Sequence, residues 1–245
     1  MNTGKSATPF MTARWTNLAL VTYAIEPDRL KDVLPPECVA DTIGGEAFVS
    51  LVAFDFLDTH VLGLAWPGFR NFPEVNLRAY VRHTTPSGEI RRGVCFIREF
   101  VPQRWVAQMA RLIYNEPYLA VPMHSEIIHD RATFTVRHRL LFEGQEQSLA
   151  ITGENISHQP AAHSVEHFFK EHSWGFGTSR GRRLIQYRVN HPIWEVHPVR
   201  QLQLNWDFEL VYGEDWQFLN ALKPKHVMLA AGSMVQVLPR GRGLD

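Results

Sequence analysis

The chain has 245 residues, which at about 150 residues per domain corresponds to one large domain or two small ones. Hydrophobic residues make up 45% of it and charged residues 20%, which supplies a core and excludes a disordered or fibrous chain. The 25 Lys and Arg residues balance the 25 Asp and Glu residues, so no net charge would attract nucleic acid or an anionic membrane. We therefore expect no nucleic-acid partner and no membrane partner.

The cysteine content and the N-terminal segment indicate a cytoplasmic, single-domain protein. Cys38 and Cys95 are too few for a disulfide framework, and no apolar run reaches the roughly 18 residues of a membrane helix. Residues 1–14 lack the apolar core of a signal peptide and are predicted to form a flexible arm. Residues 15–245 contain no linker or internal repeat, so we expect one domain there.

The first half of the chain predicts strands joined by short turns, with one amphipathic helix. Residues 74–82 alternate strictly between apolar and polar side chains, as a strand with two different faces does. Gly44-Gly45 predicts a tight hairpin between 39–43 and 46–56. Residues 103–114 carry an apolar stripe at helical spacing. The other predicted elements of this half are strands at 15–25 and 93–100 and a short helix near 28–34.

The second half predicts further strands and a second short helix, at 164–171. Residues 202–210 alternate most clearly, and 175–181 is a glycine-rich segment that is typical of a loop. The other predicted strands are 122–128, 132–142, 148–153, 182–189 and a closing strand at 227–238. Antiparallel strands with few helices and no β-α-β alternation predict an α+β, mainly antiparallel β fold, either a closed barrel or a pair of sheets.

Gly177 to Gly181 fits the G-x-S-x-G pattern of a serine nucleophile, and Asp207 and His226 follow in the order that α/β-hydrolases use. That motif needs a helix directly after Ser179, whereas the residues from Arg182 onward read as a strand. We therefore interpret the segment as a glycine-rich loop.

His163 and His167 are four residues apart, the spacing at which two histidines on one helix face bind zinc. Glu166 stands at the wrong position for the H-E-x-x-H motif, and no third ligand is evident. A solvated helix face explains the pair, so we expect no metal site and no other cofactor.

The polar face of 74–82 is the most informative feature of the sequence. In a β-barrel, alternate residues of a strand point into the interior. There, an arginine can bind a carboxylate, a glutamate can act as general acid or base, and an asparagine can orient a carbonyl. The alternative is a solvated outer face whose charges pair across strands. The face consists of Glu74, Asn76, Arg78, Tyr80 and Arg82.

Several separated motifs carry a resemblance to a known family. They are the run from Phe72 to Val81, Gly93 to Phe96, Ala110-Arg111 with Pro117-Tyr118 and Met123, and His191 to Trp194. In order and spacing they resemble a family of uncharacterised bacterial proteins, grouped as a domain of unknown function, which is similar in turn to acetoacetate decarboxylase. The resemblance spans roughly residues 15–239. It implies an acetoacetate decarboxylase-like β-barrel around an enclosed cavity, with the polar face of 74–82 directed inward.

The sequence departs from the decarboxylase at the catalytic lysine. The decarboxylase forms a Schiff base through a lysine that follows a proline, and the corresponding residue here, after Pro117, is Tyr118. A phenol cannot form an imine. The lysines of the chain all fall in predicted tails, helix surfaces or loops: Lys5, Lys31, Lys170, Lys223 and Lys225. We therefore predict no Schiff-base decarboxylase activity.

The resemblance implies roles for individual residues. Glu74 aligns with an acidic cavity residue of the decarboxylase, so it and Tyr118 are the candidate catalytic groups. Arg78 and Arg111 would bind a carboxylate or an enolate. The remaining candidate ligand contacts are Asn76, Tyr80, Met123 and His191. For His191 the resemblance gives a position but no role, and the alternative is that His191-Pro192 begins a strand and Trp194 is a core aromatic residue.

Together these features predict an enclosed site for an oxo or carboxylated metabolite, and a lysine-independent lyase, isomerase or hydratase reaction. One alternative is a ligand-binding or sensor barrel that has lost decarboxylase chemistry. A second is a barrel whose interior is filled by aromatic side chains, which are 11% of the chain. A homo-oligomer is compatible with each of these three interpretations.

Overall fold

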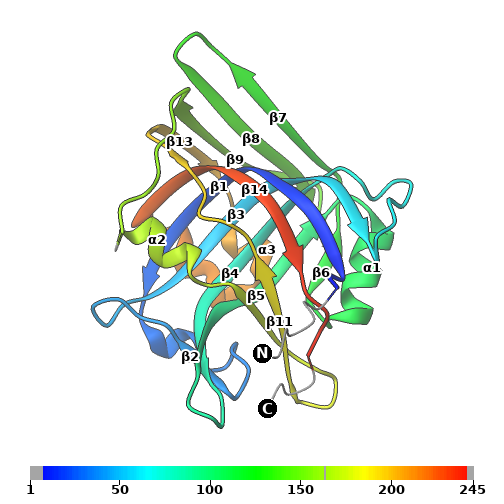
Figure 1. The fold of residues 1–245 in the computed structure, drawn as a ribbon. Helices are drawn as coiled ribbons and strands as arrows, with labels where there is room; N and C mark the ends of the chain where they lie inside the picture. Colours follow the sequence, from blue (N-terminus) through cyan, green and yellow to red (C-terminus); the bar gives the residue numbers. More distant parts are fainter. Residues whose placement is uncertain (1–7, 163, 242–245) are drawn as a thin grey trace.

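The computed structural model describes residues 8–162 and 164–241. Figure 1 shows a molecule built mainly of long, curved strands. The elements are β1 (Met11–Ile25), η1 (Pro27–Leu30), β2 (Cys38–Ala40), β3 (Ala47–Val61), β4 (Phe72–Thr84), β5 (Ile90–Val101), α1 (Arg104–Ile113), β6 (Tyr118–Ala120), β7 (Met123–His129), β8 (Thr133–Phe142), β9 (Gln145–Glu154), α2 (Val165–Lys170), β10 (Trp174–Thr178), β11 (Leu184–Asn190), β12 (Val196–His197), β13 (Val199–Asn205), α3 (Phe208–Tyr212), η2 (Glu214–Asn220) and β14 (His226–Val237).

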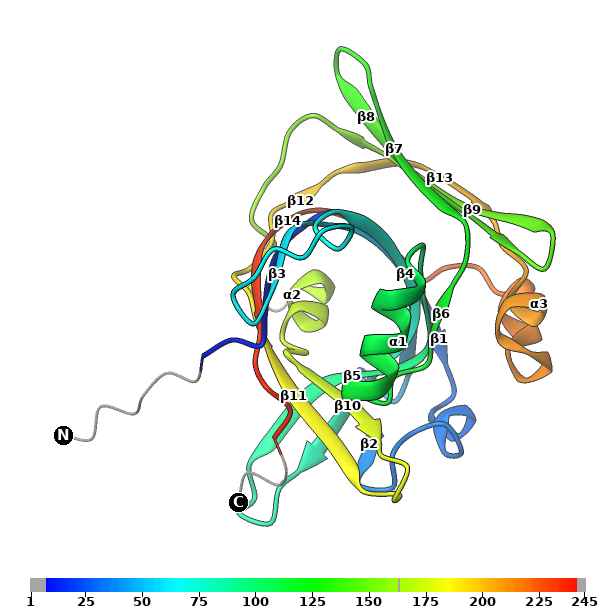
Figure 2. The ribbon, with the colours of Figure 1, turned by 90° about the vertical axis from the view of Figure 1, so that its right-hand side faces the viewer.

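Within the described residues, seven strands close a barrel. Their hydrogen-bonded order is β4-β3-β1-β14-β11-β10-β5, and β5 pairs back onto β4 (Figure 2). All neighbours are antiparallel except β10 and β5, which are parallel. The closure between β11 and β14 is the shortest, with two residue pairs. Because the ring returns to its first strand, alternate residues of each strand face an enclosed interior.

A second sheet, of order β13-β9-β8-β7, lies outside the barrel against β1, β3 and β4 (Figure 2). It buries the outward residues of the barrel wall, among them Val21, Leu51 and Leu77, in one large core. The inward residues, such as Leu20 and Val52, belong to a separate core inside the ring. These strands are therefore buried on both faces, and the polar face predicted for 74–82 can only point into the barrel.

An irregularity in β1 turns an additional aromatic residue inward. The register with β3 shifts between Thr16 and Ala19, and Asn17 has a positive φ of 57°. Such a bulge inserts a residue and changes which side chains face one side of the sheet. As a result Trp15 and Leu18, three positions apart, both contact the interior core.

The helices α1 and α2 lie in the opening of the ring (Figure 2). The hydroxyl of Ser164 caps α2 by accepting a hydrogen bond from the backbone N of His167, 3.2 Å away. Phe169 of α2 packs against Tyr80 with ring centroids 4.6 Å apart, which closes one end of the interior. The apolar stripe predicted for 103–114 belongs to α1 and faces the barrel interior through Trp105, Val106, Met109 and Ile113, whereas Leu112 is exposed. No helix among the described residues is long and apolar enough to cross a membrane.

The fold class is as predicted: α+β, mainly antiparallel β, with a barrel and a few short helices. One prediction that was wrong is the loop at 175–181, because Trp174–Thr178 forms strand β10. The strand predicted over 202–210 ends at Asn205. Asp207 then caps α3, accepting hydrogen bonds from the backbone N of Glu209 and Leu210.

Two further boundaries differ from the prediction. The Gly44-Gly45 turn forms, with φ values of 60° and 87°, but Cys38–Ala40 pairs with β4 instead of completing a hairpin with β3. Strand β1 begins at Met11, so residues 11–14 are part of the barrel and not of a flexible arm. Residues 1–7 of the predicted arm lie outside the described residues.

Candidate functional site

The barrel encloses a cavity of about 480 Å³, which lies between α1 and α2. This volume is in the range of small-molecule sites. Most of the wall is aromatic or aliphatic, and the polar side chains gather where β4, β5 and the segment after α1 meet. The interior is therefore not filled by aromatic side chains.

Three carboxyl groups line the polar wall and act on one another electrostatically: Glu74 on β4, Glu99 on β5 and Glu116 after α1. Asn76 Nδ2 donates to Glu74 Oε1 at 2.9 Å, and the Tyr118 hydroxyl donates to Glu74 Oε2 at 2.9 Å. Glu99 has no hydrogen-bond partner within the described residues, because the single hydroxyl proton of nearby Tyr118 is already donated to Glu74. Both carboxylate oxygens of Glu74 therefore accept hydrogen bonds, whereas neither oxygen of Glu99 accepts one from the described side chains.

The third carboxyl, Glu116, accepts a short hydrogen bond from the hydroxyl of Tyr187 on β11. Burial raises the pKa of both tyrosine hydroxyls, Tyr118 and Tyr187, well above 10, and the neighbouring carboxylates add to this effect. Both hydroxyls therefore remain protonated near neutral pH and act as hydrogen-bond donors.

The carboxyl groups bind protons more tightly than free glutamate. Burial raises the pKa of Glu74 to about 7, although its hydrogen bonds and the charge of Arg78 act in the opposite direction. Burial and the charge of Glu74 raise the pKa of Glu116 to about 8, and burial raises the pKa of Glu99 well above its usual range. The groups titrate together, so the cluster holds bound protons at neutral pH and can exchange them.

This cluster predicts that folding stability falls as the pH rises. A carboxyl whose pKa is higher in the folded state binds more protons there, so its contribution is complete below about 4.5 and is lost as the pH passes 7 to 8. Glu116→Gln mimics the protonated form and keeps an acceptor for Tyr187. We expect its free energy of unfolding to equal that of the wild type at pH 5 and to exceed it by on the order of 3 kcal/mol at pH 9.

Denaturant titrations at both pH values measure the difference. Glu37→Gln is the control, because Glu37 is exposed and its side chain has no hydrogen-bond partner within the described residues. A wild-type protein that is equally stable at pH 5 and pH 9 would contradict the buried-acid cluster.

Gly175 positions the tyrosine that holds Glu116. It pairs with Tyr187 across β10 and β11, and a Cβ atom at Gly175 would lie 2.2 Å from the Tyr187 ring. Gly175→Ala should therefore displace the ring and destabilise the protein by about 1–3 kcal/mol. Gly177→Ala, on the same strand, is the control, because its added methyl group meets no atom closer than 4.0 Å. Equal melting temperatures for the two variants would contradict this packing.

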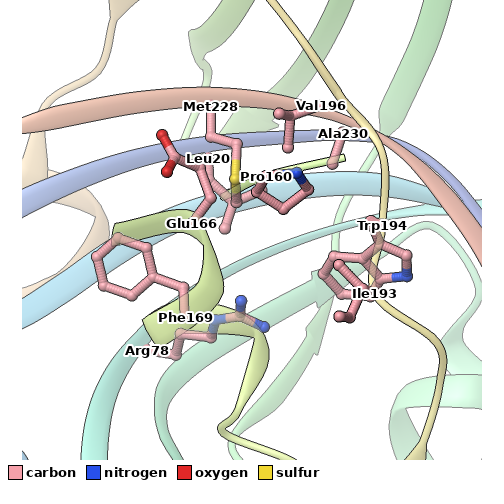
Figure 3. A pocket seen from close by; sticks show the side chains of 10 residues that line it. All are labelled: Leu20, Arg78, Pro160, Glu166, Phe169, Ile193, Trp194, Val196, Met228 and Ala230. Carbon is pink, nitrogen blue, oxygen red and sulfur yellow. The ribbon is translucent and has the colours of Figure 1, made fainter. Parts of the chain in front are cut away.

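A buried cation lies beyond the acid cluster on the same strand. Arg78 is 9% exposed, and Figure 3 shows its guanidinium between the side chains of Phe169 and Trp194. Its Nε has no hydrogen-bond partner and no carboxylate lies within salt-bridge distance in the described parts of the chain. The carboxylate of Glu166 points away from it in Figure 3. A buried cation without a paired anion is costly, and a carboxylate ligand would supply the missing partner.

Polar atoms without a protein partner gather on the cavity wall. Among the described residues twelve buried side-chain atoms lack one, and seven of the twelve belong to residues that line the cavity. Native proteins satisfy nearly all buried polar groups, with water or a ligand where protein atoms are absent. Each of these atoms is itself covered by its neighbours, so the unpartnered polar atoms lie within the wall, and a ligand could reach them only after local rearrangement. The seven atoms are Trp15 Nε1, Thr59 Oγ1, Asn76 Oδ1, Arg78 Nε, both carboxylate oxygens of Glu99 and Tyr114 Oη.

Comparison with known proteins gives the family. A family model described as "Uncharacterized conserved protein" and named DUF2071 matches residues 12–234. This chain belongs to the DUF2071 family. The uncharacterized protein YqjF of Bacillus subtilis (strain 168) is 27% identical over 117 residues, which is 47% of the DUF2071 chain and 46% of YqjF. The match therefore spans about half of that relative's length.

Solved structures similar to the DUF2071 chain have the acetoacetate decarboxylase fold. The match to acetoacetate decarboxylase from Legionella pneumophila covers 98% of this chain and 88% of the decarboxylase chain, with a TM-score of 0.62 and 15% identity. The match to the enduracididine biosynthesis enzyme MppR complexed with pyruvate covers 98% of this chain and 93% of that one, with a TM-score of 0.61 and 19% identity. An acetoacetate decarboxylase-like enzyme from Sphingomonas wittichii RW1 covers 99% and 97%, with a TM-score of 0.61 and 14% identity. These matches confirm the family resemblance and the fold inferred from the sequence.

Five of the predicted site residues of the DUF2071 chain line the cavity together: Glu74, Asn76, Arg78, Tyr118 and His191. His191 stacks on Trp194 with ring centroids 4.3 Å apart. Tyr80 is fully buried behind them, where its hydroxyl lies 2.9 Å from Ser50 Oγ. Tyr80 therefore supports the closed end of the cavity. Arg82, the last residue of the predicted polar face, is exposed.

Arg111 and Met123, the other two predicted ligand contacts, do not line this cavity. Arg111 is exposed on α1, because that helix turns the residues at 105, 106, 109, 110 and 113 toward the cavity. Met123, in β7, packs against the core between the barrel and the outer sheet.

The residues that the sequence analysis missed are Glu99, Glu116 and Tyr187. Glu99 lies opposite Asn76 in the pairing of β5 with β4, so a correct register would have placed it on the inward face. Glu116 directly precedes the motif residues Pro117 and Tyr118, and this position in the sequence could have indicated that it belongs to the site.

Neither the G-x-S-x-G motif nor the histidine pair, both set aside in the sequence analysis, forms a site among the described residues. Ser179 accepts a hydrogen bond from the backbone N of Arg183 in a turn, and Asp207 caps α3. Among the described residues no group of three His, Cys, Asp or Glu side chains could hold a metal ion. His163 lies outside the described residues.

Proposed function

We propose that this DUF2071 protein binds an oxo or carboxylated metabolite in the barrel cavity and converts it in a lysine-independent lyase, isomerase or hydratase reaction. The observation that carries the proposal is the buried guanidinium of Arg78, which has no carboxylate partner within the described residues and shares one strand face with Glu74. The two residues are four positions apart, or roughly 13 Å along the strand, and their long side chains shorten this gap. A ligand carboxylate on Arg78 brings its oxo group and adjacent carbon toward Glu74.

Glu74 has the properties of a general acid or base. Its pKa of about 7 lets it accept or release a proton near neutral pH, where acid-base catalysis is most effective. Asn76 and Tyr118 bind its two oxygens and so fix the direction of proton transfer. While Glu74 is ionised, the single proton of the Tyr118 hydroxyl is donated to it. Once Glu74 has accepted the proton from carbon, the Tyr118 hydroxyl can redirect its own proton to the enolate oxygen.

The fold neighbours support a 2-oxo acid as the ligand class. MppR is described in complex with pyruvate, and also with the condensation product of pyruvate and imidazole 4-carboxaldehyde. The cavity of the present protein has an arginine for such a carboxylate. Among the described residues that line it there is no lysine, so an imine intermediate is not part of the proposal.

We therefore expect borohydride treatment in the presence of acetoacetate or pyruvate to leave the mass of the protein unchanged. Intact-protein mass spectrometry checks this. A covalent adduct of the reduced ligand would show that a lysine reaches the site and would overturn the lysine-independent mechanism.

The second candidate function is a non-catalytic sensor or carrier of the same ligand. Tyr118 at the position of the decarboxylase lysine favours it, since loss of the nucleophile leaves a cavity that still binds. The two functions differ in what Glu74 does: it transfers protons in the enzyme and only shapes the pocket in the sensor.

A thermal-shift screen with millimolar pyruvate, longer 2-oxo acids, 3-oxo acids, 2-hydroxy acids and unsaturated carboxylic acids tests the binding site. A ligand at a hundred times its Kd stabilises the folded state by about 2.7 kcal/mol, or roughly 5–11 °C in a chain of this size. We expect at least one oxo acid to produce such a shift. If no carboxylic acid raises the melting temperature, the proposed site is wrong.

A further inference from the structure

The cavity changes character along β4, from a polar closed end to an apolar open end. Arg78 lies near the closed end, where Tyr80 packs on Phe169 of α2. Glu74 follows toward the other end of the strand, and Phe72 begins it. Arg78 and Phe72 are six positions apart, or roughly 20 Å of strand. A ligand anchored at Arg78 thus has space beyond Glu74.

Apolar side chains surround the open end. Trp105 and Met109 of α1 and Leu62 and Trp66 of the segment after β3 line the cavity and are at the same time exposed. Side chains with both properties mark the rim of the opening. Exposed apolar groups around an opening are typical of the entrance to a site for an apolar ligand.

An aromatic wall connects the rim with the polar end. The rings of Phe56 and Phe72 stack with centroids 4.7 Å apart, Phe54 lies 5.2 Å from Phe56, and Trp15 lies 5.0 Å from Phe54. Trp15 is in turn 6.2 Å from Trp194. The wall therefore presents aromatic surface continuously from Arg78 to the rim, and a small acid such as pyruvate would leave most of it uncovered.

We propose that the ligand is an amphiphilic oxo acid whose carboxylate binds Arg78 and whose bulky apolar group, an aryl ring or an unbranched alkyl chain, lies along this aromatic wall toward the rim. The inference rests on the proposed function, because it uses the same anchor at Arg78. It adds that most of the binding free energy comes from the apolar group. The cavity volume of about 480 Å³ fits a ligand of that size better than a three- or four-carbon acid.

Calorimetric titration with straight-chain 2-oxo acids from pyruvate to 2-oxodecanoate, and with phenylpyruvate, tests the inference. Each methylene buried on the wall should tighten Kd about threefold to fourfold. The gain should end where the chain passes the rim. Phenylpyruvate should bind at least tenfold more tightly than pyruvate.

A matched pair of variants locates the apolar group. Trp105→Ser removes a rim side chain that is 68% exposed, and Leu112→Ser removes one on the same helix that is 70% exposed but does not line the cavity. Trp105→Ser should weaken binding of 2-oxodecanoate severalfold and leave pyruvate unchanged. Leu112→Ser should change neither.

The outcomes separate the two proposals. If short acids bind and Kd does not tighten with chain length, the apolar-ligand inference is overturned while the Arg78 site stands. Suppose that Kd tightens with chain length but Trp105→Ser and Leu112→Ser change the Kd of 2-oxodecanoate equally. The apolar group then lies elsewhere, and the inference is again overturned. If no acid of the series binds, the proposed function itself fails.

Discussion

Arg78→Met should weaken binding of 2-oxo acids at least about a hundredfold and at the same time stabilise the free protein. The ligand effect follows because methionine fills a similar volume without a charge, and removing one member of a buried charge pair costs 2–5 kcal/mol or more. The stability effect has the opposite sign because the unliganded protein buries this cation without a carboxylate partner in its described residues. We expect a gain of about 1–3 kcal/mol at pH 6, where Glu74 is mostly protonated.

Calorimetry and denaturant titration measure the two effects separately. Arg82→Met is the matched control, since Arg82 lies on the same strand but is exposed. It should leave Kd unchanged and alter stability by less than about 0.5 kcal/mol. An Arg78→Met variant that binds as well as the wild type would show that Arg78 does not hold the ligand carboxylate.

Glu74→Gln should reduce turnover by about 10²–10⁴ while changing Kd only a few fold. The amide keeps the shape of the side chain, but it cannot accept a proton from carbon or return one. The readout is exchange of deuterium from solvent into C3 of a bound 2-oxo acid, followed by NMR. This exchange reports removal of the proton beside the oxo group, a step that lyase, isomerase and hydratase reactions through an enolate share.

Glu37→Gln, at an exposed glutamate, should exchange at the wild-type rate. The pH profile of the wild type should rise with ionisation of Glu74 near pH 7, and Glu74→Gln should lose this rise. If the wild type binds the acid but exchanges no faster than buffer, the sensor function replaces the enzyme. If Glu74→Gln exchanges at the wild-type rate, Glu74 is not the acid or base.

The sequence predicted those parts of the fold that depend on local patterns. Alternation in 74–82 fixed the directions of Glu74, Asn76 and Arg78 relative to one another, because strand geometry has a period of two. Closure of the barrel depends on long-range pairing of β10 with β5 and of β11 with β14, which no local pattern encodes. The outer sheet then buries the second face of β4, so inward and outward could be assigned only after the layers were known.

Two wrong predictions have specific physical causes. Gly175 and Gly177 suggested a loop, but Gly175 lies in a strand where the ring of Tyr187 leaves no room for a side chain. The alternation that continues through Trp206 and Phe208 concealed a helix start, although Asp207 is a typical capping residue. In both cases tertiary contacts overrode the simplest interpretation of the pattern.

The candidate site was predicted in part. The residues of one strand face and of the family motifs could be predicted from the sequence. Glu99 joins the cluster only because β5 pairs with β4, and Glu116 only because the segment after α1 comes back to the same wall. Arg111 shows the opposite case, because a motif position on an amphipathic helix can face solvent, as this residue does. The absence of a carboxylate partner for Arg78 among residues 8–162 and 164–241 is visible only in the structure, since it requires knowing which carboxylates do not reach it.

The most direct test of whether the barrel cavity is a carboxylate site compares one ligand with and without its negative charge. Calorimetry should be run with 2-oxooctanoate and with its methyl ester, which keeps the oxo group and the chain but removes the carboxylate. We expect the acid to bind and the ester to bind at least about thirtyfold more weakly, because the guanidinium of Arg78 loses its anionic partner. Equal affinities for acid and ester would contradict the claim that the barrel cavity is a carboxylate site.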